Sequence, residues 1–134
     1  MSMFAIFNVS GSAVSAQAQR LNVVASNLAN ADAVAGPDGK SYKARQVQFQ
    51  TVPMGGPGSA GVKVQTVTES EQPGRRVFQP DHPGADGGGY VTHSNVNPVE
   101  EMVNMISASR SYQNNVEVMN TAKSLLLKTL QMGN

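Results

Sequence analysis

The residues of this chain best suited to chemistry lie in one loop-forming stretch, DHPGADGGGYVTH at 81–93. The stretch contains two imidazoles and two carboxylates, on Asp81, His82, Asp86 and His93. These residue types can bind zinc. Their spacing matches no compact metal signature, and turn chemistry alone explains Asp and Gly at such positions. We therefore expect neither a metal site nor a cofactor here.

Other catalytic arrangements find little support in the sequence. The chain has no cysteine nucleophile. The run GADGGG lacks the Lys-Ser/Thr pair of a phosphate-binding loop. Glu69 and Glu71 are a carboxylate pair of the kind that cleaves glycans, but no aromatic platform for a sugar accompanies them. We expect that the chain is not an enzyme, and glycan cleavage and metal binding remain alternatives.

Composition and charge restrict the other classes of function. The chain has 134 residues, of which 5% are aromatic and 14% are charged, whereas a typical soluble domain has about 25% charged residues. Such a chain has few bulky apolar side chains with which to form a core of its own, so we expect partner chains to stabilise it. The net charge of +1, without a basic cluster, argues against nucleic-acid binding. The sequence shows neither a signal peptide nor an apolar run long enough to span a membrane.

The sequence falls into three segments that specify the fold class. Residues 1–32 contain no proline and predict a helix, and residues 98–134 predict another. Residues 33–97 hold eleven of the 13 glycines and six of the 7 prolines, and the alternation of Val47 and Phe49 with glutamines predicts strands there. We predict a mainly α fold in which a small β insert lies outside a helical stem.

Both terminal segments repeat apolar residues every seven positions, which is typical of a coiled-coil seam. The first row consists of Phe7, Val14, Ala18, Leu21, Ala25 and Leu28. The second row consists of Met102, Met105, Tyr112, Val116, Met119, Leu126 and Leu130. We expect the two rows to pair the helices as an antiparallel coiled-coil stem. Gly11 weakens the first helix, so we expect the first ten residues to be frayed or separately folded in an isolated subunit.

Asparagines occupy helix positions where a soluble helix would carry Lys and Glu. They are Asn22, Asn27, Asn30, Asn114, Asn115 and Asn120. Amides can hydrogen-bond across a contact without the desolvation cost of a charge. We expect them to pair with neighbouring subunits and backbone. The alternative is that Asn30 caps a helix end while Asn22 and Asn27 face water.

The second helix has a well-marked beginning. Asn97 is a good N-cap residue, Pro98 fits the first helical position, and Glu100 falls where a capping box places a carboxylate. The sequence therefore predicts that this helix starts at Pro98.

Three stretches of the chain resemble the proximal rod proteins of the bacterial flagellar basal body: QRLNVVASNLANAD at 19–32, GPDGKSYKARQVQF at 36–49, and the long block beginning NVNPVEEMVNM at 95. The resemblance implies a structural subunit that polymerises into a hollow drive shaft carrying torque from motor to hook. It further implies export by the flagellar type III apparatus with an uncleaved N-terminus, and assembly in the periplasm. The implied neighbours are other copies, the other proximal and distal rod subunits, and the export-gate adaptor at the base.

Two further interpretations remain open at this point. Another axial subunit of the rod or hook would share the architecture, although the short insert favours the proximal rod. An amphipathic module that binds a membrane or partner would need a basic face on its first helix, and Arg20 is the only charge between residues 1 and 31.

Overall fold

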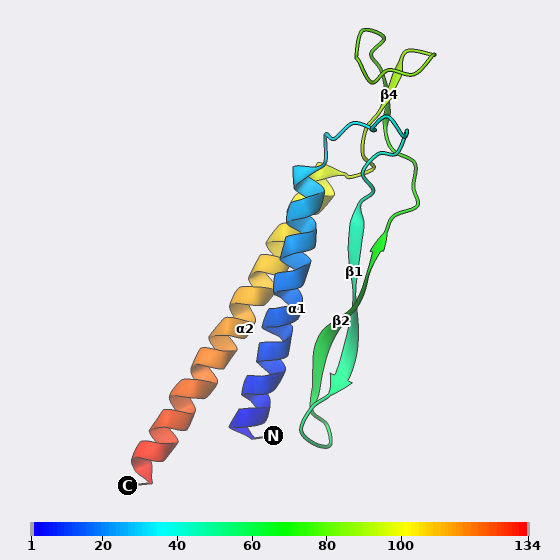
Figure 1. Ribbon diagram of the computed structural model, residues 1–134. Coiled ribbons are helices and arrows are strands. Elements are labelled where there is room, and N and C mark those ends of the chain that lie inside the picture. Colours follow the sequence, from blue (N-terminus) through cyan, green and yellow to red (C-terminus); the bar gives the residue numbers. More distant parts are fainter. Residues whose placement is uncertain (1, 134) are drawn as a thin grey trace. The chain divides into compact units, whose positions relative to one another are not determined.

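The computed structural model describes residues 2–133, so residues 1 and 134 of the predicted terminal segments lie outside the described part. In chain order the elements are α1 (Met3–Ala29), β1 (Arg45–Pro53), β2 (Ala60–Glu69), β3 (Arg76–Phe78), β4 (Tyr90–Thr92) and α2 (Pro98–Met132) (Figure 1). The strands form two sheets of two strands each, β1 with β2 and β3 with β4. The predicted fold class, mainly α with a small β part between two helices, is confirmed.

The chain divides into two compact units. The first contains the residues up to Leu21, Val47–Thr66 and the residues from Ile106 onward. The second contains Asn22–Gln46 and Val67–Met105. Each helix contributes residues to both units.

In the first unit, α1 and α2 lie side by side and run in opposite directions (Figure 1). At Gly11 a side chain would have its Cβ 3.7 Å from the Met119 methyl group. Ser12 Oγ accepts a hydrogen bond from Val62 N at 3.1 Å, which connects α1 to β2. The helix continues through Gly11 without interruption. The expectation about the first ten residues of an isolated subunit stays a prediction.

The second unit has its core at the small β3–β4 sheet. The strands pair antiparallel with Val77 opposite Val91, and Val91 is fully buried. An isolated bridge between Val34 and His93 attaches the segment that follows α1 to this sheet. At Gly74 an added Cβ would collide with the carbonyl oxygen of His93. The backbone can therefore approach this closely only because residue 74 has no side chain.

The start of α2 also lies in the second unit. Asn97 Oδ1 accepts hydrogen bonds from Val99 N at 3.1 Å and Glu100 N at 3.3 Å. Two of the N–H groups left free at the helix start are thus satisfied. Pro98 is the first helical residue. The Glu100 side chain is exposed, and no hydrogen bond returns from it to Asn97 within the described chain.

The buried row on α2 differs from the predicted one. Glu101, Ala108 and Ala122 are buried, whereas Met102 and Leu130 are 55% and 60% exposed. Glu101 directly precedes Met102, and Ala108 and Ala122 follow Glu101 at multiples of seven, so burial at these points lies one position before the predicted companion row. Val116 of that row is half-buried. The other predicted row on α2, which runs from Met105 through Tyr112 and Met119 to Leu126, is half-buried.

On α1 the buried positions are Ala16, Val24 and Asn27 together with Ser10. The predicted seam residues Val14, Ala18, Leu21 and Leu28 are half-buried, Ala25 is exposed, and Phe7 is exposed as well. Small side chains fill most of the buried positions, which allows the elements of each unit to approach closely. No helix in residues 2–133 has the length and apolar character needed to span a membrane.

Candidate assembly surfaces and the polar junction

A junction of amide and hydroxyl groups in the second unit connects the end of α1 to the start of β1. Its centre is Asn27, whose side chain is fully buried. Asn27 Nδ2 donates to Arg45 O at 2.8 Å, and Asn27 Oδ1 accepts from Arg45 N at 2.9 Å. The Tyr42 hydroxyl donates to the same oxygen at 2.9 Å and lies 3.0 Å from Ser26 Oγ. The buried amide is thereby well satisfied, as burial of a polar group requires.

The segment immediately before α2 supplies the other half of this junction. Ser94 Oγ donates to Ala31 O at 2.6 Å, just after the end of α1. Asn95 Oδ1 accepts from Ala44 N at 2.6 Å, and Asn95 Nδ2 donates to Gln72 O at 2.9 Å. Four separate stretches of the chain are thus held together by side chains that bind backbone. The junction fixes where the insert leaves the helices.

These contacts correct part of the prediction for the asparagines. Asn27 is buried and bonded to its own chain, so it is neither an inter-subunit contact nor exposed to water. Asn30 Nδ2 donates to Ser26 O at 2.9 Å and Asn115 Nδ2 donates to Ser111 O at 2.7 Å, both next to or within their own helices. The remaining predicted contacts are exposed and stay candidates for neighbouring chains: Asn22, Asn114 and Asn120.

Sequence reasoning could have found the burial of Asn27. Val24 and Asn27 stand three positions apart on α1, so they share one helix face, and both are buried. The hydrogen bonds of Tyr42, Ser94 and Asn95 could not be predicted from neighbouring residues, because their partners lie far away along the chain.

Of the four residues that looked capable of chemistry, His82 and Asp86 stabilise turns. His82 Nδ1 accepts from Gly84 N at 2.9 Å, and His93 Nδ1 lies 3.4 Å from Asp32 O. Asp81 is exposed. Across residues 2–133, no group of three or more potential metal-binding side chains gathers at one place.

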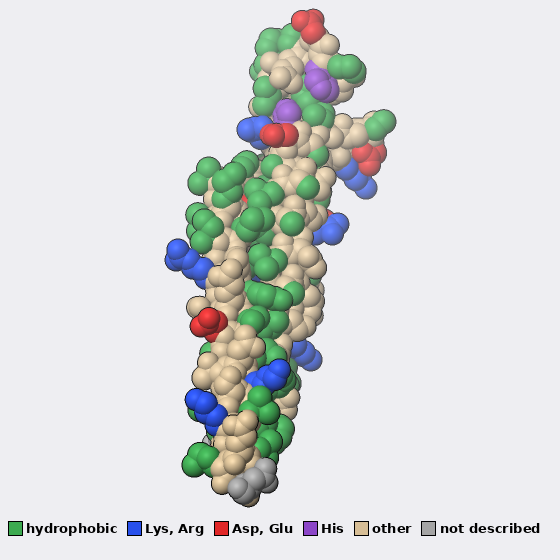
Figure 2. Space-filling view, turned by 90° about the vertical axis from the view of Figure 1, so that its left-hand side faces the viewer, with side chains coloured by type: hydrophobic (Ala, Val, Ile, Leu, Met, Phe, Trp, Pro, Cys, Tyr) green, Lys and Arg blue, Asp and Glu red, His purple; other side chains and the backbone are tan. Residues whose placement is uncertain are grey.

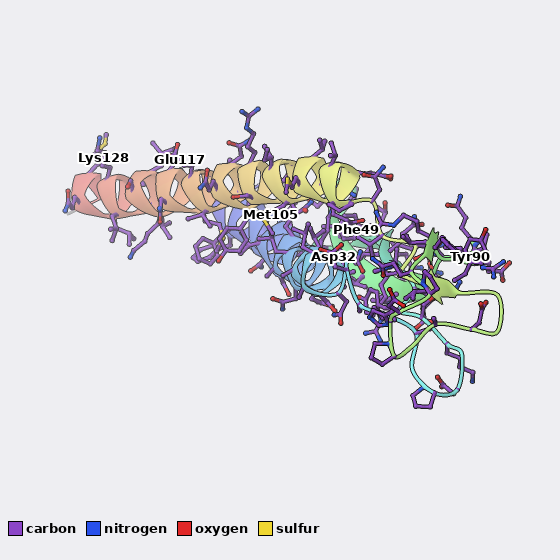
Figure 3. All side chains as sticks on the ribbon, turned by 90° about the horizontal axis from the view of Figure 1, so that it is seen from above. Asp32, Phe49, Tyr90, Met105, Glu117 and Lys128 are labelled. Atoms are coloured by element: carbon purple, nitrogen blue, oxygen red, sulfur yellow. The ribbon has the colours of Figure 1, made fainter. Side chains whose placement is uncertain are left out.

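Asp86 organises the loop between β3 and β4. Its Oδ1 accepts from Tyr90 N at 3.0 Å and Gly88 N at 2.9 Å, and its Oδ2 pairs with Arg76 at 2.9 Å. The hydrogen bond from the Tyr90 backbone, followed by the Gly88 and Arg76 interactions, holds the pKa of Asp86 below its ordinary value. Arg76 also lies over the ring of Tyr90, 4.7 Å from its centroid, and Phe78 packs edge-on against the same ring. Tyr90 is labelled in Figure 3.

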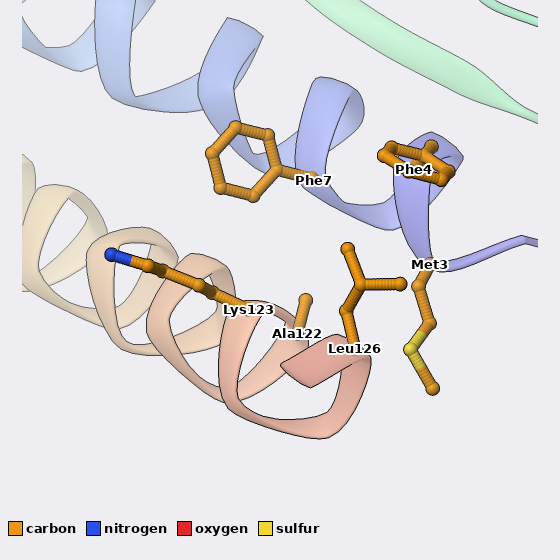
Figure 4. Close-up of a pocket in the computed structure, with 6 residues that line it drawn as sticks. All are labelled: Met3, Phe4, Phe7, Ala122, Lys123 and Leu126. Carbon is orange, nitrogen blue, oxygen red and sulfur yellow. The ribbon is translucent and has the colours of Figure 1, made fainter. Parts of the chain in front are cut away.

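An apolar pocket opens in the first unit between the beginning of α1 and the last turns of α2. It encloses 380 Å³ and is lined by Met3, Phe4, Phe7, Ala122, Lys123 and Leu126 (Figure 4). Lys123 is the only charged residue of this lining. Phe4 and Phe7 are 65% and 40% exposed. An uncovered apolar hollow of this kind is typical of a surface that binds another protein.

Along α2, large apolar side chains are exposed over most of the helix. They are Val99, Met102, Val103, Ile106, Val118, Leu125, Leu127, Leu130 and Met132. Figure 2 shows hydrophobic side chains gathered on the surface of the molecule, with few charged groups among them. Figure 3 shows side chains projecting from α2 on several sides, including those of Glu117 and Lys128. A helix that remains apolar on its exposed side normally packs against a further partner.

Comparison with known proteins identifies the family of the chain. Residues 7–37 match the family described as flagella basal body rod protein, and residues 88–132 match the flagellar basal body rod FlgEFG protein C-terminal family. The flagellar basal-body rod protein FlgC of Yersinia enterocolitica is 58% identical over 99% of both chains. Those of Escherichia coli O157:H7 and Salmonella typhimurium strain LT2 are 57% and 56% identical, again over 99% of both chains.

The chain belongs to the FlgC family of flagellar basal-body rod proteins. The resemblance noted from the sequence is therefore confirmed. As an FlgC-family chain it is a structural protein of the flagellar basal-body rod. The first family match contains most of α1 with Asn27, and the second contains β4 and all of α2. The matched segments thus include both helices that carry the uncovered apolar surfaces.

Proposed function

We propose that this FlgC-family chain is a structural subunit of the proximal rod, which polymerises with other rod proteins into a hollow shaft that transmits torque from motor to hook. The observation that carries the proposal is the 57% identity to an FlgC rod protein over 99% of both chains. The exposed apolar side chains of both helices support it, because a subunit buried among neighbours can leave such surface uncovered when alone.

The proposed mechanism of assembly is helical. Heterologous contacts that do not close into a ring generate an open helical polymer. The half-buried rows on the two helices, Val14, Leu21 and Leu28 on α1 and Tyr112, Met119 and Leu126 on α2, hold one subunit together. The flanking faces, with exposed amides such as Asn22, Asn114 and Asn120, bind subunits along and around the shaft. Residues at the beginning of α1 gain full order on incorporation, which couples polymerisation to folding.

The partners and location follow from the same proposal. We expect contacts with other copies, with the remaining proximal and distal rod subunits, and with the export-gate adaptor at the base. Export proceeds through the flagellar type III apparatus with the N-terminus uncleaved, and assembly takes place in the periplasm. The chain acts as a mechanical element and has no catalytic role.

The junction around Asn27 suits this mechanical role. The insert is attached to the helices of the second unit by hydrogen bonds from Asn27, Ser94 and Asn95 to backbone groups. Such bonds fix an orientation more narrowly than apolar contacts, because their strength depends on angle as well as distance. We propose that they keep the insert in a constant position while the shaft rotates.

The test replaces helix residues of the first unit by aspartate. Leu21→Asp and Met119→Asp, both half-buried positions, should abolish swimming and basal-body rod formation while the protein is still expressed, because each introduces an unpaired charge between helices. The control is Gln79→Asp, which adds the same charge at an exposed position of the insert and should leave swimming intact. Normal motility of both helix variants would overturn the proposal.

A further inference from the structure

A polar cavity lies within the second unit, next to the β3–β4 sheet. It measures 420 Å³ and is lined by parts of residues 39–43 and 69–76 together with Thr92. A cavity of about 300–1,000 Å³ has the size that holds a small-molecule ligand. Three of the lining residues are cationic, Lys40, Lys43 and Arg76, and one is a carboxylate, Glu69.

The cations at this cavity contrast with the charge of the unit that holds them. The second unit contains five Lys or Arg residues and eight Asp or Glu residues, a net charge of −3. Three of these five cations nevertheless line one cavity. Like charges gathered in one place repel one another, and an anion bound between them removes the repulsion. The arrangement therefore indicates a place for a negatively charged ligand.

Salt bridges neutralise only part of this positive charge. Arg76 Nη2 pairs with Asp86 Oδ2 at 2.9 Å, and Glu69 pairs with an arginine outside the lining at 3.8 Å. Lys40 and Lys43 form no salt bridge within residues 2–133. Two positive charges thus remain uncompensated at the cavity, which suits a ligand with two negative charges.

The lining also offers hydrogen-bond donors that the described chain leaves unused. The Lys43 ammonium group donates to Gln72 O at 2.8 Å and has two further N–H groups. Ser41 and Thr92 both line the cavity, and their hydroxyls have no hydrogen-bond partner among residues 2–133. A Cβ added to Gly74 would lie 2.9 Å from Ser41 Oγ and 3.0 Å from Thr92 Cγ2, so these two side chains gather at the same glycine.

We propose that this cavity binds a small dianion, a phosphate monoester or a dicarboxylate, between Lys40 and Lys43. Both kinds of ligand present oxygens that accept charge-assisted hydrogen bonds from ammonium and hydroxyl donors. The guanidinium of Arg76 is already held by Asp86 and by the ring of Tyr90, whose centroid lies 4.7 Å from Arg76 Cζ. It therefore adds donors without a further loss of side-chain freedom. The binding requires only the single chain and is separate from the proposed function.

The binding is measured by NMR on the full ¹⁵N-labelled chain, with ionic strength held constant by sodium chloride because salt alone screens exposed charges. The probes are methyl phosphate, which like other phosphate monoesters carries about −1.5 to −2 charges at neutral pH, succinate with two carboxylates, and acetate with one. Methyl phosphate or succinate should shift the amide resonances of Ser41, Gly74 and Thr92 and reach saturation. Saturation by only one of the two identifies which kind of dianion the cavity takes. Acetate should bind about two- to fivefold more weakly, because it pairs with one lysine in place of two.

Removal of single charges locates the site. Lys40→Gln and Lys43→Gln should each weaken binding of the dianion about two- to fivefold, the range for an exposed ion pair. The control Lys63→Gln removes the same charge from an exposed position of β2 in the first unit and should leave the affinity unchanged. Circular dichroism checks that each variant is folded. If Lys43→Gln does not fold, because it loses the bond to Gln72, Lys40→Gln alone decides the outcome.

Three results would contradict binding at this cavity. The first is a set of shifts that rises linearly with both dianions and never saturates. The second is an equal loss of affinity in Lys40→Gln and in the Lys63→Gln control. The third is binding of acetate as tight as that of the dianions, which would show that the two lysines do not act on one ligand.

Discussion

The side chain of Asn27 binds both backbone groups of Arg45, with Nδ2 donating to the carbonyl at 2.8 Å and Oδ1 accepting from the amide at 2.9 Å. This two-point contact imitates the pairing that a neighbouring strand would offer to β1. Arg45 is the first residue of β1. The side chain of Asn27 supplies the hydrogen-bond partners that the backbone N–H and C=O of Arg45 would otherwise need from a neighbouring strand. One amide thus allows a short insert to begin next to a helix without a larger sheet.

Replacement of Asn27 should measure the strength of this junction. In Asn27→Ala the amide and carbonyl of Arg45 lose their side-chain partner, and the Tyr42 hydroxyl keeps only Ser26 Oγ, 3.0 Å away. We expect the free energy of unfolding to fall by about 2 to 4 kcal/mol, since unsatisfied buried groups cost about 1–3 kcal/mol each and some are rescued by water. Thermal unfolding followed by circular dichroism provides the measurement.

The matched control for this replacement is Asn22→Ala, which removes an exposed asparagine from the same helix. A surface change of this kind should stay within about 0.5 kcal/mol of the original stability. Equal losses in the two variants would mean that the contacts of Asn27 add nothing beyond those of any helical asparagine.

The local signals in the sequence were sufficient for the fold class. Absence of proline, seven-residue apolar spacing and the Asn97-Pro98 start predict the terminal helices, because these signals act within a few turns. The Asn97 side chain caps α2, and the crowding of glycine and proline in residues 33–97 marks the insert. The family resemblance required long exact stretches and extended over nearly the whole chain.

The junction could not be predicted in the same way. Ser94 and Ala31 meet across 63 residues, and Asn95 and Ala44 across 51. Nothing in the sequence near Ser94 specifies which distant carbonyl it will bind. The seam on α2 was misplaced for a related reason: Met102 is larger and more apolar than Glu101, yet Glu101 is the buried one. Hydrophobicity alone does not predict burial on a helix that leaves large apolar side chains exposed.

Gly74 should tolerate no side chain. In Gly74→Ala the new Cβ would collide with the His93 carbonyl oxygen and lie 2.9 Å from Ser41 Oγ. Because the closest obstacle is backbone, the strand and the loop must shift, and we expect a loss of about 2 to 3 kcal/mol. The control is Gly87→Ala, where nothing lies within 4 Å of the new Cβ. Thermal unfolding of both variants should separate them clearly, and equal stability would contradict the tight packing at Gly74.

Unlike Gly74, Gly11 should tolerate an alanine side chain. A Cβ at this position meets only the Met119 methyl group at 3.7 Å, an ordinary contact. Alanine in a helix interior is favoured over glycine by about 0.5 to 1 kcal/mol. We expect Gly11→Ala to raise the helix content of the isolated subunit, as measured by circular dichroism. If the first ten residues are already fully helical in the isolated subunit, the helix content will not change and the expectation of fraying is wrong.

Asp86 should make the loop between β3 and β4 sensitive to acid. Its pKa lies below the ordinary value of 3.8 because the folded loop donates hydrogen bonds from Tyr90 and Gly88 and pairs the carboxylate with Arg76. Since the folded pKa is the lower one, the stabilisation by Asp86 is fully present above the ordinary value and is lost as pH falls through the folded pKa. In NMR spectra the amide resonances of Gly88 and Tyr90 should titrate together, with a midpoint below 3.8. The variant Asp86→Asn should abolish this titration and weaken the protection of the Tyr90 amide from hydrogen exchange at neutral pH. A midpoint at or above the ordinary value would show that the carboxylate does not organise the loop.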